Sequence, residues 1–127
     1  MMAFKLYNTL TNRKEQFKPR EPGRVKLFTC GPSVYRKQHL GNFRTFLYED
    51  VLQKYLEYQN LKVKRVIIFT DVEDKAIEEA RGKGVSLEAQ RGPVEKIFFQ
   101  ECKLLKIKLP DEVPRATSCV DSAVDLI

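Results

Sequence analysis

Apolar and polar residues alternate along the chain in a pattern that predicts a parallel β-α-β unit. Residues 25–30 (VKLFTC) alternate enough to form a strand, which Gly31-Pro32 should end. Over residues 41–58, apolar side chains recur at steps of three and four, as they do on one face of a helix, and Asn60 is the predicted stop. Residues 62–69 (KVKRVIIF) are β-branched and end in an apolar run, which suits a buried parallel strand.

A helix start is predicted directly after the second strand. The segment Thr70-Asp71-Val72-Glu73 has the form of a capping box, in which Thr70 caps the helix and Glu73 reaches back to it. A helix through about residue 81 should follow and end at the glycines at 82 and 84. The acidic residues at this start resemble a magnesium site, but favourable charge at a helix N-terminus is the simpler explanation.

The remaining residues predict two further helices. Apolar side chains from Leu87 to Leu105 recur at helical spacing, and Gly92-Pro93 should break or kink this helix near its start. Residues 110–115 predict a loop, and residues 118–121 predict the start of a last helix. The order strand, helix, strand, helix, helix indicates an α/β fold: a right-handed βαβ core with a parallel sheet, extended by C-terminal helices.

Composition narrows the class of protein. The chain has 127 residues, of which 43% are hydrophobic and 31% charged, as expected for one soluble globular domain. The sequence has no apolar run of the roughly 18–20 residues that a membrane helix needs, and no secretory signal segment at its start. We therefore expect a cytoplasmic protein that does not bind membranes. The three cysteines, Cys30, Cys102 and Cys119, are odd in number and widely spaced, so no disulfide framework is predicted.

The net charge of the chain is a weak indication of the kind of partner that it binds. The chain carries 23 basic and 17 acidic residues, for a net charge of +6, which favours polyanions such as nucleotides or RNA. A solvated surface with extra lysines explains the charge alone more simply.

Candidate chemistry is concentrated in residues 30–42, CGPSVYRKQHLGN. Parallel sheets bind ligands at the carboxyl edge of their strands, and a helix start offers free N–H groups to a phosphate. Gly41 lets a nucleotide approach closely, and His39 can donate a hydrogen bond to phosphate oxygens. Each feature alone has a simpler explanation, because a lone histidine is usually structural and Cys30 alone suits a small buried apolar position.

The combination resembles a known family. His39-Leu40-Gly41-Asn42 is similar to the H-I-G-H signature of class I aminoacyl-tRNA synthetases, and more narrowly the chain resembles cysteinyl-tRNA synthetase. The resemblance implies the first half of a Rossmann-like nucleotide-binding fold of the HIGH type. It implies one partial catalytic domain over residues 1–127, without an anticodon-binding domain. The matching segments cover nearly the whole chain: 6–11, Phe17 with Pro19, 30–35, 39–42, 44–46, 50–52, 55–56, 69–75 and 112–117.

The resemblance also implies an activity. Enzymes of this family activate L-cysteine with ATP, which brings Mg²⁺, to form cysteinyl-adenylate, and then transfer the cysteinyl group to the 3′ end of tRNA(Cys). A zinc ion in their active site binds the substrate thiolate, since zinc favours sulfur ligands. Cys30 matches the family's first zinc ligand.

Further site residues follow from the same resemblance. His39, Gly41 and Asn42 match the catalytic, ATP-binding signature. Gly31 and Thr70 match positions that line the cysteine pocket, although Thr70 has an alternative role as the cap of the following helix.

The sequence departs from the family at four places and in length. Asn42 replaces the second histidine of the signature, Ile68 stands where asparagine is usual, and Cys119 stands where histidine is usual. Gly92-Pro93 interrupts a region that is normally helical. The family's other three zinc ligands, its K-M-S-K-S loop and its anticodon-binding helices lie downstream of the matching region. We therefore expect one zinc ligand only, little activity of this chain alone, a complementary downstream half as partner, and self-association through an incomplete sheet.

Two alternatives stay open at this point. The first is a non-catalytic relative of the synthetase that binds nucleotide, RNA or a protein partner. The second is a related ligase that joins cysteine to an amino sugar, although residues 31–35 (GPSVY) match the synthetase pattern better.

Overall fold

The protein, described here from a computed structural model over residues 4–127, contains two small sheets. Strands β1 (Lys5–Asn8) and β2 (Arg13–Gln16) form an antiparallel hairpin. Strands β3 (Arg24–Ser33) and β4 (Lys62–Thr70) pair in parallel, which confirms the predicted α/β fold class. The predicted domain and the predicted absence of a signal segment both include residues 1–3, which lie outside the described residues.

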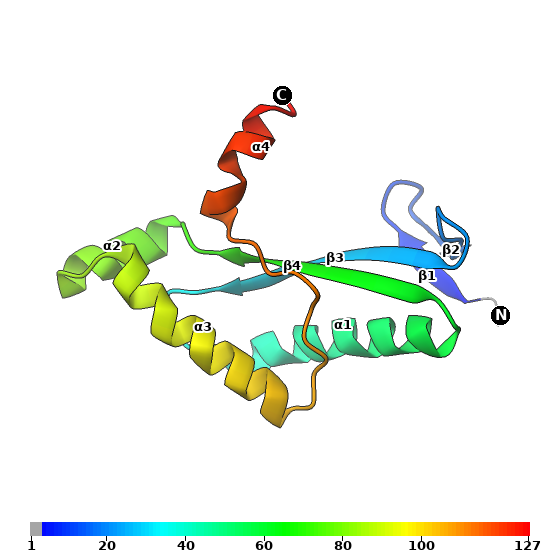
Figure 1. Ribbon diagram of the computed structural model, residues 1–127, viewed down its shortest axis with the longest axis horizontal. Helices are drawn as coiled ribbons and strands as arrows, with labels where there is room; N and C mark the ends of the chain where they lie inside the picture. Colours follow the sequence, from blue (N-terminus) through cyan, green and yellow to red (C-terminus); the bar gives the residue numbers. More distant parts are fainter. Residues whose placement is uncertain (1–3) are drawn as a thin grey trace.

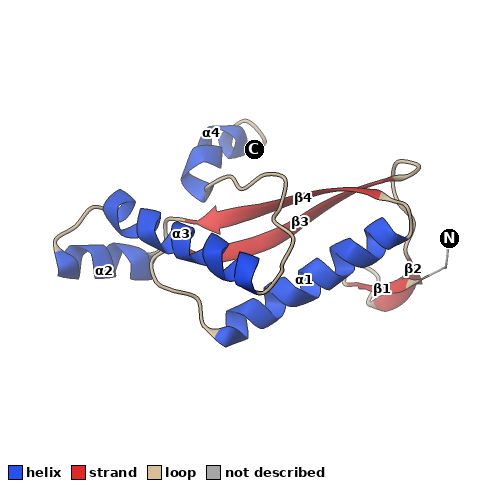
Figure 2. Ribbon diagram, turned by 60° about the horizontal axis from the view of Figure 1, so that its bottom comes forward, coloured by secondary structure: helices blue, strands red, loops and turns tan. Residues whose placement is uncertain are grey.

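The helices follow the predicted order. Helix α1 joins β3 to β4, and α1 and α3 lie on the same side of the β3–β4 pair, with α4 on the other side (Figures 1 and 2). Among residues 4–127, no helix combines the length and the apolar content required to cross a bilayer. The helical elements are α1 (Leu40–Tyr58), α2 (Asp74–Lys83), α3 (Leu87–Leu104), the 3-10 helix η1 (Ala116–Cys119) and α4 (Val120–Val124).

An aromatic cluster joins α3 to α1 and to the sheet. The ring of Phe98 in α3 lies 5.2 Å from Phe46, 6.0 Å from Phe43 and 5.7 Å from Phe69, measured between ring centroids. Phe98 is buried, as are the three rings around it. The offset and edge-on contacts are those that aromatic pairs prefer, so the cluster fixes the positions of α1 and α3 against β4.

The predicted helix cap at Thr70 is wrong. Thr70 is the last residue of β4, where it pairs with Ser33 and its carbonyl oxygen accepts a hydrogen bond from the Val34 N–H at 3.2 Å. Helix α2 begins at Asp74, and Glu73 occupies the N-cap position without a side-chain bond. The hydrogen bonds of the sheet thus keep the chain extended beyond the point where the local sequence favours a helix.

Two predicted stops also differ from the structure. β3 runs through Gly31-Pro32 to Ser33, with an irregularity in its pairing between Cys30 and Ser33. Helix α3 contains Pro93 and continues through it, so the predicted break there is not observed. Proline has a helical φ and removes only one hydrogen bond, while the packing of the α3 residues beyond it against the core offsets that loss. Gly84 ends α2 with φ of 64°, as predicted, whereas Gly82 lies inside the helix.

The loop after α3 follows the free edge of β4. Glu112 and Arg115 form parallel bridges with Val66 and Phe69, and the Phe69 N–H donates to the carbonyl oxygen of Pro114 at 2.9 Å. β4 therefore has bonded neighbours on both sides. Within residues 4–127, β3 pairs with β4 along its length. Apart from one bridge between its first residue, Arg24, and Glu21, its other edge is open among these residues.

We expect this open edge to cause self-association. Phe28 of β3 is 63% exposed, and an unpaired strand edge offers hydrogen bonds to another chain. The mean mass in analytical ultracentrifugation should rise with protein concentration, and Phe28→Lys should reduce that rise. Tyr48→Lys removes a comparably exposed ring from α1 and serves as the control. A single monomeric species at high concentration would contradict the prediction.

Candidate nucleotide-binding site

A cavity of about 380 Å³ opens at the carboxyl end of β3. It lies between the end of the strand, the loop that follows and the start of α1. Cys30 and His39 line this same cavity and both are exposed, whereas Gly41 and Thr70 are not among its lining residues. The lining residues are Cys30, Gly31, Pro32, Ser33, Tyr35, Arg36, Lys37, Gln38, His39, Asn42, Thr45 and Phe46.

His39 caps helix α1 at the rim of the cavity. Its Nδ1 accepts a hydrogen bond from the Asn42 backbone N–H at 3.4 Å, and Asn42 Oδ1 accepts from the His39 N–H at 3.2 Å. The asparagine that departs from the family signature thus completes a capping box. Because Nδ1 is an acceptor, a neutral ring carries its proton on Nε2, which leaves an N–H donor on the outer side of the ring.

Gly31 and Gly41 permit the close contacts around the cavity because they have no Cβ atom. A Cβ at Gly41 would lie 2.9 Å from His39 Cε1, so only glycine lets the ring lie against the helix start. A Cβ at Gly31 would lie 2.3 Å from the carbonyl oxygen of Ile68, so glycine lets β3 and β4 approach closely at the cavity. Strand packing is therefore sufficient to explain Gly31, and a role in binding cysteine stays a proposal.

Basic side chains give the cavity a cationic rim. Arg36 and Lys37 line it, and each also forms an ion pair, Arg36 with Glu79 at 3.2 Å and Lys37 with Glu101 at 2.9 Å. The Arg36 guanidinium also lies over the Tyr35 ring, 4.7 Å from its centroid. Together with the partial positive charge of the α1 N-terminus, these cations make the cavity suitable for an anion.

The described residues do not form a zinc site by themselves. Across residues 4–127, no group of three or more histidine, cysteine, aspartate or glutamate side chains is placed to hold a metal ion. Cys30 is free and exposed, whereas Cys102 is buried in the core, where burial raises the pKa of its thiol to about 11. A tetrahedral zinc site needs four ligands, so Cys30 would need ligands from other residues.

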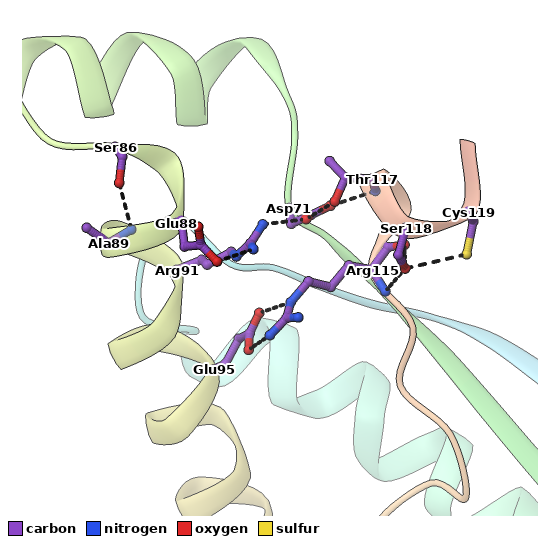
Figure 3. Close-up of polar contacts among 10 residues, drawn as sticks. All are labelled: Asp71, Ser86, Glu88, Ala89, Arg91, Glu95, Arg115, Thr117, Ser118 and Cys119. Atoms are coloured by element: carbon purple, nitrogen blue, oxygen red, sulfur yellow. Dashed lines mark hydrogen bonds and ion pairs between the residues drawn. The ribbon is translucent and has the colours of Figure 1, made fainter. Parts of the chain in front are cut away.

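A buried polar network that the sequence did not reveal lies beside the end of β4 (Figure 3). Asp71 is 3% exposed, and its carboxylate accepts hydrogen bonds from the Thr117 N–H at 3.0 Å and from Arg91 at 2.9 Å. Burial raises the pKa of Asp71, but the hydrogen bonds from Thr117 and the charge of Arg91 outweigh it, so the pKa is below its usual value. The explanation of the acidic residues by helix-terminal charge is confirmed for Asp74, which lies in the first turn of α2, and wrong for Asp71, whose carboxylate joins η1 to α3.

Asp71→Asn should therefore destabilise the protein in a pH-dependent way. A lowered pKa in the folded state stabilises the fold above the unfolded pKa of about 3.9, and this contribution is lost as pH falls through the folded pKa. We expect a loss of about 1–3 kcal/mol at pH 7, and a smaller difference between variant and wild type at pH 3. Urea unfolding at both pH values measures this, with the exposed Asp121→Asn as control. Equal losses at the two pH values would contradict the assignment.

Class I aminoacyl-tRNA synthetases are among the nucleotide-binding α/β proteins that have a parallel β-α-β unit with a cavity at the start of its helix. The chain belongs to the family of tRNA synthetases class I (C) catalytic domains, whose family model matches residues 16–127.

Curated relatives agree with this assignment. The chain is 42% identical over 123 residues to a cysteine–tRNA ligase of Pyrococcus furiosus, which covers 97% of this chain and 26% of the relative. It is 42% identical over 121 residues to the cysteine–tRNA ligase of Methanosarcina mazei (95% and 26%) and 36% identical over 126 residues to that of Protochlamydia amoebophila (99% and 26%). The chain thus spans about a quarter of the length of these relatives, and it is a cysteinyl-tRNA synthetase-like segment of a class I catalytic domain.

Proposed function

We propose that this chain supplies the ATP-binding part of a cysteine–tRNA ligase active site. The complete enzyme would activate L-cysteine with ATP and Mg²⁺ to form cysteinyl-adenylate, and would then transfer the cysteinyl group to the 3′ end of tRNA(Cys). The observation that carries the proposal is that Cys30 and His39 line one open cavity at the carboxyl end of β3. Family membership over residues 16–127 supports the same reaction.

In this proposal the start of α1 binds the phosphates of ATP. The N–H groups of Leu40 and Gly41 open the helix and have no acceptor within it, so they are free to bind phosphate oxygens. His39 Nε2–H adds a donor directed away from the cap, and Asn42 holds the ring in that orientation. These donors would stabilise the charge that develops on the phosphates as the cysteine carboxylate attacks.

The cysteine substrate would lie toward the end of the strands. Gly31 lines the cavity, and Thr70 pairs with the adjacent Ser33, so both positions are near the carboxyl edge of the sheet. Zinc, when bound, would hold the substrate thiol as a thiolate. Cys30 is the one residue of the chain that we propose as its ligand, and the remaining ligands would come from a complementary part of the enzyme.

Reconstitution tests this proposal. The chain alone should not catalyse cysteine-dependent ATP–pyrophosphate exchange, whereas a mixture with the downstream segment of a relative's cysteine–tRNA ligase should. Cys30→Ser should abolish the restored exchange, and Cys119→Ser, which changes a cysteine outside the cavity, should not. A folded mixture with zinc and all substrates that shows no exchange would refute the catalytic role.

A non-catalytic relative is the second candidate, and it rests on the cavity alone, because an open cavity at the start of α1 can hold a nucleotide whether or not a reaction follows. Such a protein would use the cavity to bind nucleotide without turnover. Saturable ATP binding by the chain, with no exchange in the reconstituted mixture, would distinguish this candidate from the ligase.

A further inference from the structure

The loop between β3 and α1, residues 34–39, is bonded to helices that come much later in the chain. Its ion pairs to α2 and α3 are described above. In addition, Gln90 Nε2 in α3 donates a hydrogen bond to the backbone carbonyl oxygen of Tyr35 at 3.1 Å, across 55 residues of sequence. Gln38 Nε2 supplies bonds within the loop region, to the carbonyl oxygens of Ser33 at 2.9 Å and Arg36 at 3.0 Å.

These contacts differ in the restraint that they provide. The basic partners of the two ion pairs, Arg36 and Lys37, are 66% and 65% exposed, and exposed pairs of long side chains contribute little to stability. The Gln90 bond is partly buried and reaches the loop backbone itself. It is therefore the contact between α3 and the loop that solvent weakens least.

The oxygen atom of the Gln90 side-chain amide has no partner in the described part of the chain. This atom, Oε1, is buried and makes no hydrogen bond among the described residues. An unpaired buried acceptor costs free energy that an apolar side chain of similar size would not. If stability of α3 were the only requirement, leucine or methionine would be the better residue at position 90. The hydrogen bond from Gln90 Nε2 to the Tyr35 carbonyl oxygen explains why an amide stands there instead.

We propose that Gln90 is a positioning residue that holds the loop of residues 34–39, and through it His39, in the geometry of the nucleotide site. This inference rests on the proposed function, because it assigns a nucleotide to the cavity that this loop lines. It adds α3 to the elements that determine the affinity of the site for ATP.

Gln90→Leu tests the proposal, with Gln100→Leu, an exposed position on the same helix, as the matched control. His39 is the only histidine of the chain, so its ring resonances in NMR spectra report on the site without overlap. In Gln90→Leu the His39 ring resonances should shift and the amides of residues 34–39 should exchange faster with solvent. The urea midpoint should stay close to that of wild type, because removal of the unpaired acceptor offsets the loss of the bond to Tyr35. Gln100→Leu should change none of these.

ATP titration supplies the functional measurement. Gln90→Leu should bind ATP about three- to tenfold more weakly than wild type, the effect of losing one net hydrogen bond. If ATP leaves the wild-type His39 resonances unchanged, the proposed ATP site fails in this chain, while the exchange rates of the free protein still decide the role of Gln90.

A second variant protects the test against misfolding. Gln90→Glu keeps the size and polarity of the side chain but places an oxygen opposite the Tyr35 carbonyl oxygen. It should release the loop as Gln90→Leu does. Wild-type exchange rates and wild-type His39 resonances in whichever variant folds would overturn the proposal.

Discussion

Replacing His39 by asparagine should strongly reduce the ATP–pyrophosphate exchange of the reconstituted enzyme while the fold keeps its stability. Asparagine is a good N-cap, and its side-chain oxygen can accept the Asn42 N–H in place of His39 Nδ1. It has no group at the position of Nε2, so the donor on the outer side of the ring is lost. Removing one such donor typically costs about 100- to 1000-fold in rate, and we expect a loss of this size in ATP–pyrophosphate exchange after reconstitution.

His39→Ala separates the two roles of the residue. It should lose the same activity and, in addition, about 1 kcal/mol of stability, because α1 then lacks its cap. Urea unfolding of the two variants measures this difference directly. An ATP affinity of His39→Asn equal to that of wild type would show that the ring acts only as a cap.

Replacing Glu49 by glutamine should lower the free energy of unfolding by about 3–5 kcal/mol. The Arg65 side chain of β4 is 2% exposed and forms its ion pair with Glu49 of α1 at 2.8 Å. Its bond to Gln53 is long, at 3.4 Å, and its Nε has no partner among the described residues. Without the Glu49 carboxylate, the charge of the buried Arg65 guanidinium is left unpaired. Removing one partner of a buried ion pair costs more stability than replacing both partners by apolar residues.

The double variant Glu49→Met with Arg65→Met should recover most of that loss, because apolar residues often replace a buried ion pair without cost. Glu88→Gln is the control, since Glu88 is 83% exposed and its bond to Arg91 should contribute less than about 1 kcal/mol. Similar unfolding free energies for Glu49→Gln and Glu88→Gln would show that Arg65 retains enough solvation to be stable alone.

The regular elements of the fold were predictable because their patterns are local. Helix α1 and strand β4 begin and end within one residue of the segments predicted from periodicity. The β1–β2 hairpin has mostly exposed residues and no apolar alternation, so its two strands carry no periodic signal. Its turn has two local signals. Asn12 has φ of 53°, a conformation that asparagine tolerates better than most residues, and Asn8 Oδ1 accepts a hydrogen bond from the Leu10 N–H at 3.0 Å.

The site was predictable where it is contiguous in sequence. Residues 30–42 bring Cys30 and His39 to one cavity because a strand, a short loop and a helix start follow each other directly. The contacts of Asp71 with Thr117 and of Gln90 with Tyr35 span 46 and 55 residues, and no periodicity reports them. The Thr70 prediction failed for the same reason, because its pairing with Ser33 in the sheet overrides the capping pattern of the local sequence.

The open edge of β3 determines where the sheet can grow, and with it how the active centre can be completed. A further strand that joins this edge in parallel would run about 4.8 Å from β3 and end at the same level as Cys30. Side chains at its carboxyl end would then reach the cavity from the side opposite β4. Assembly of the sheet and assembly of a set of ligands around the Cys30 sulfur would in that case be a single event, in which metal affinity and strand pairing reinforce each other.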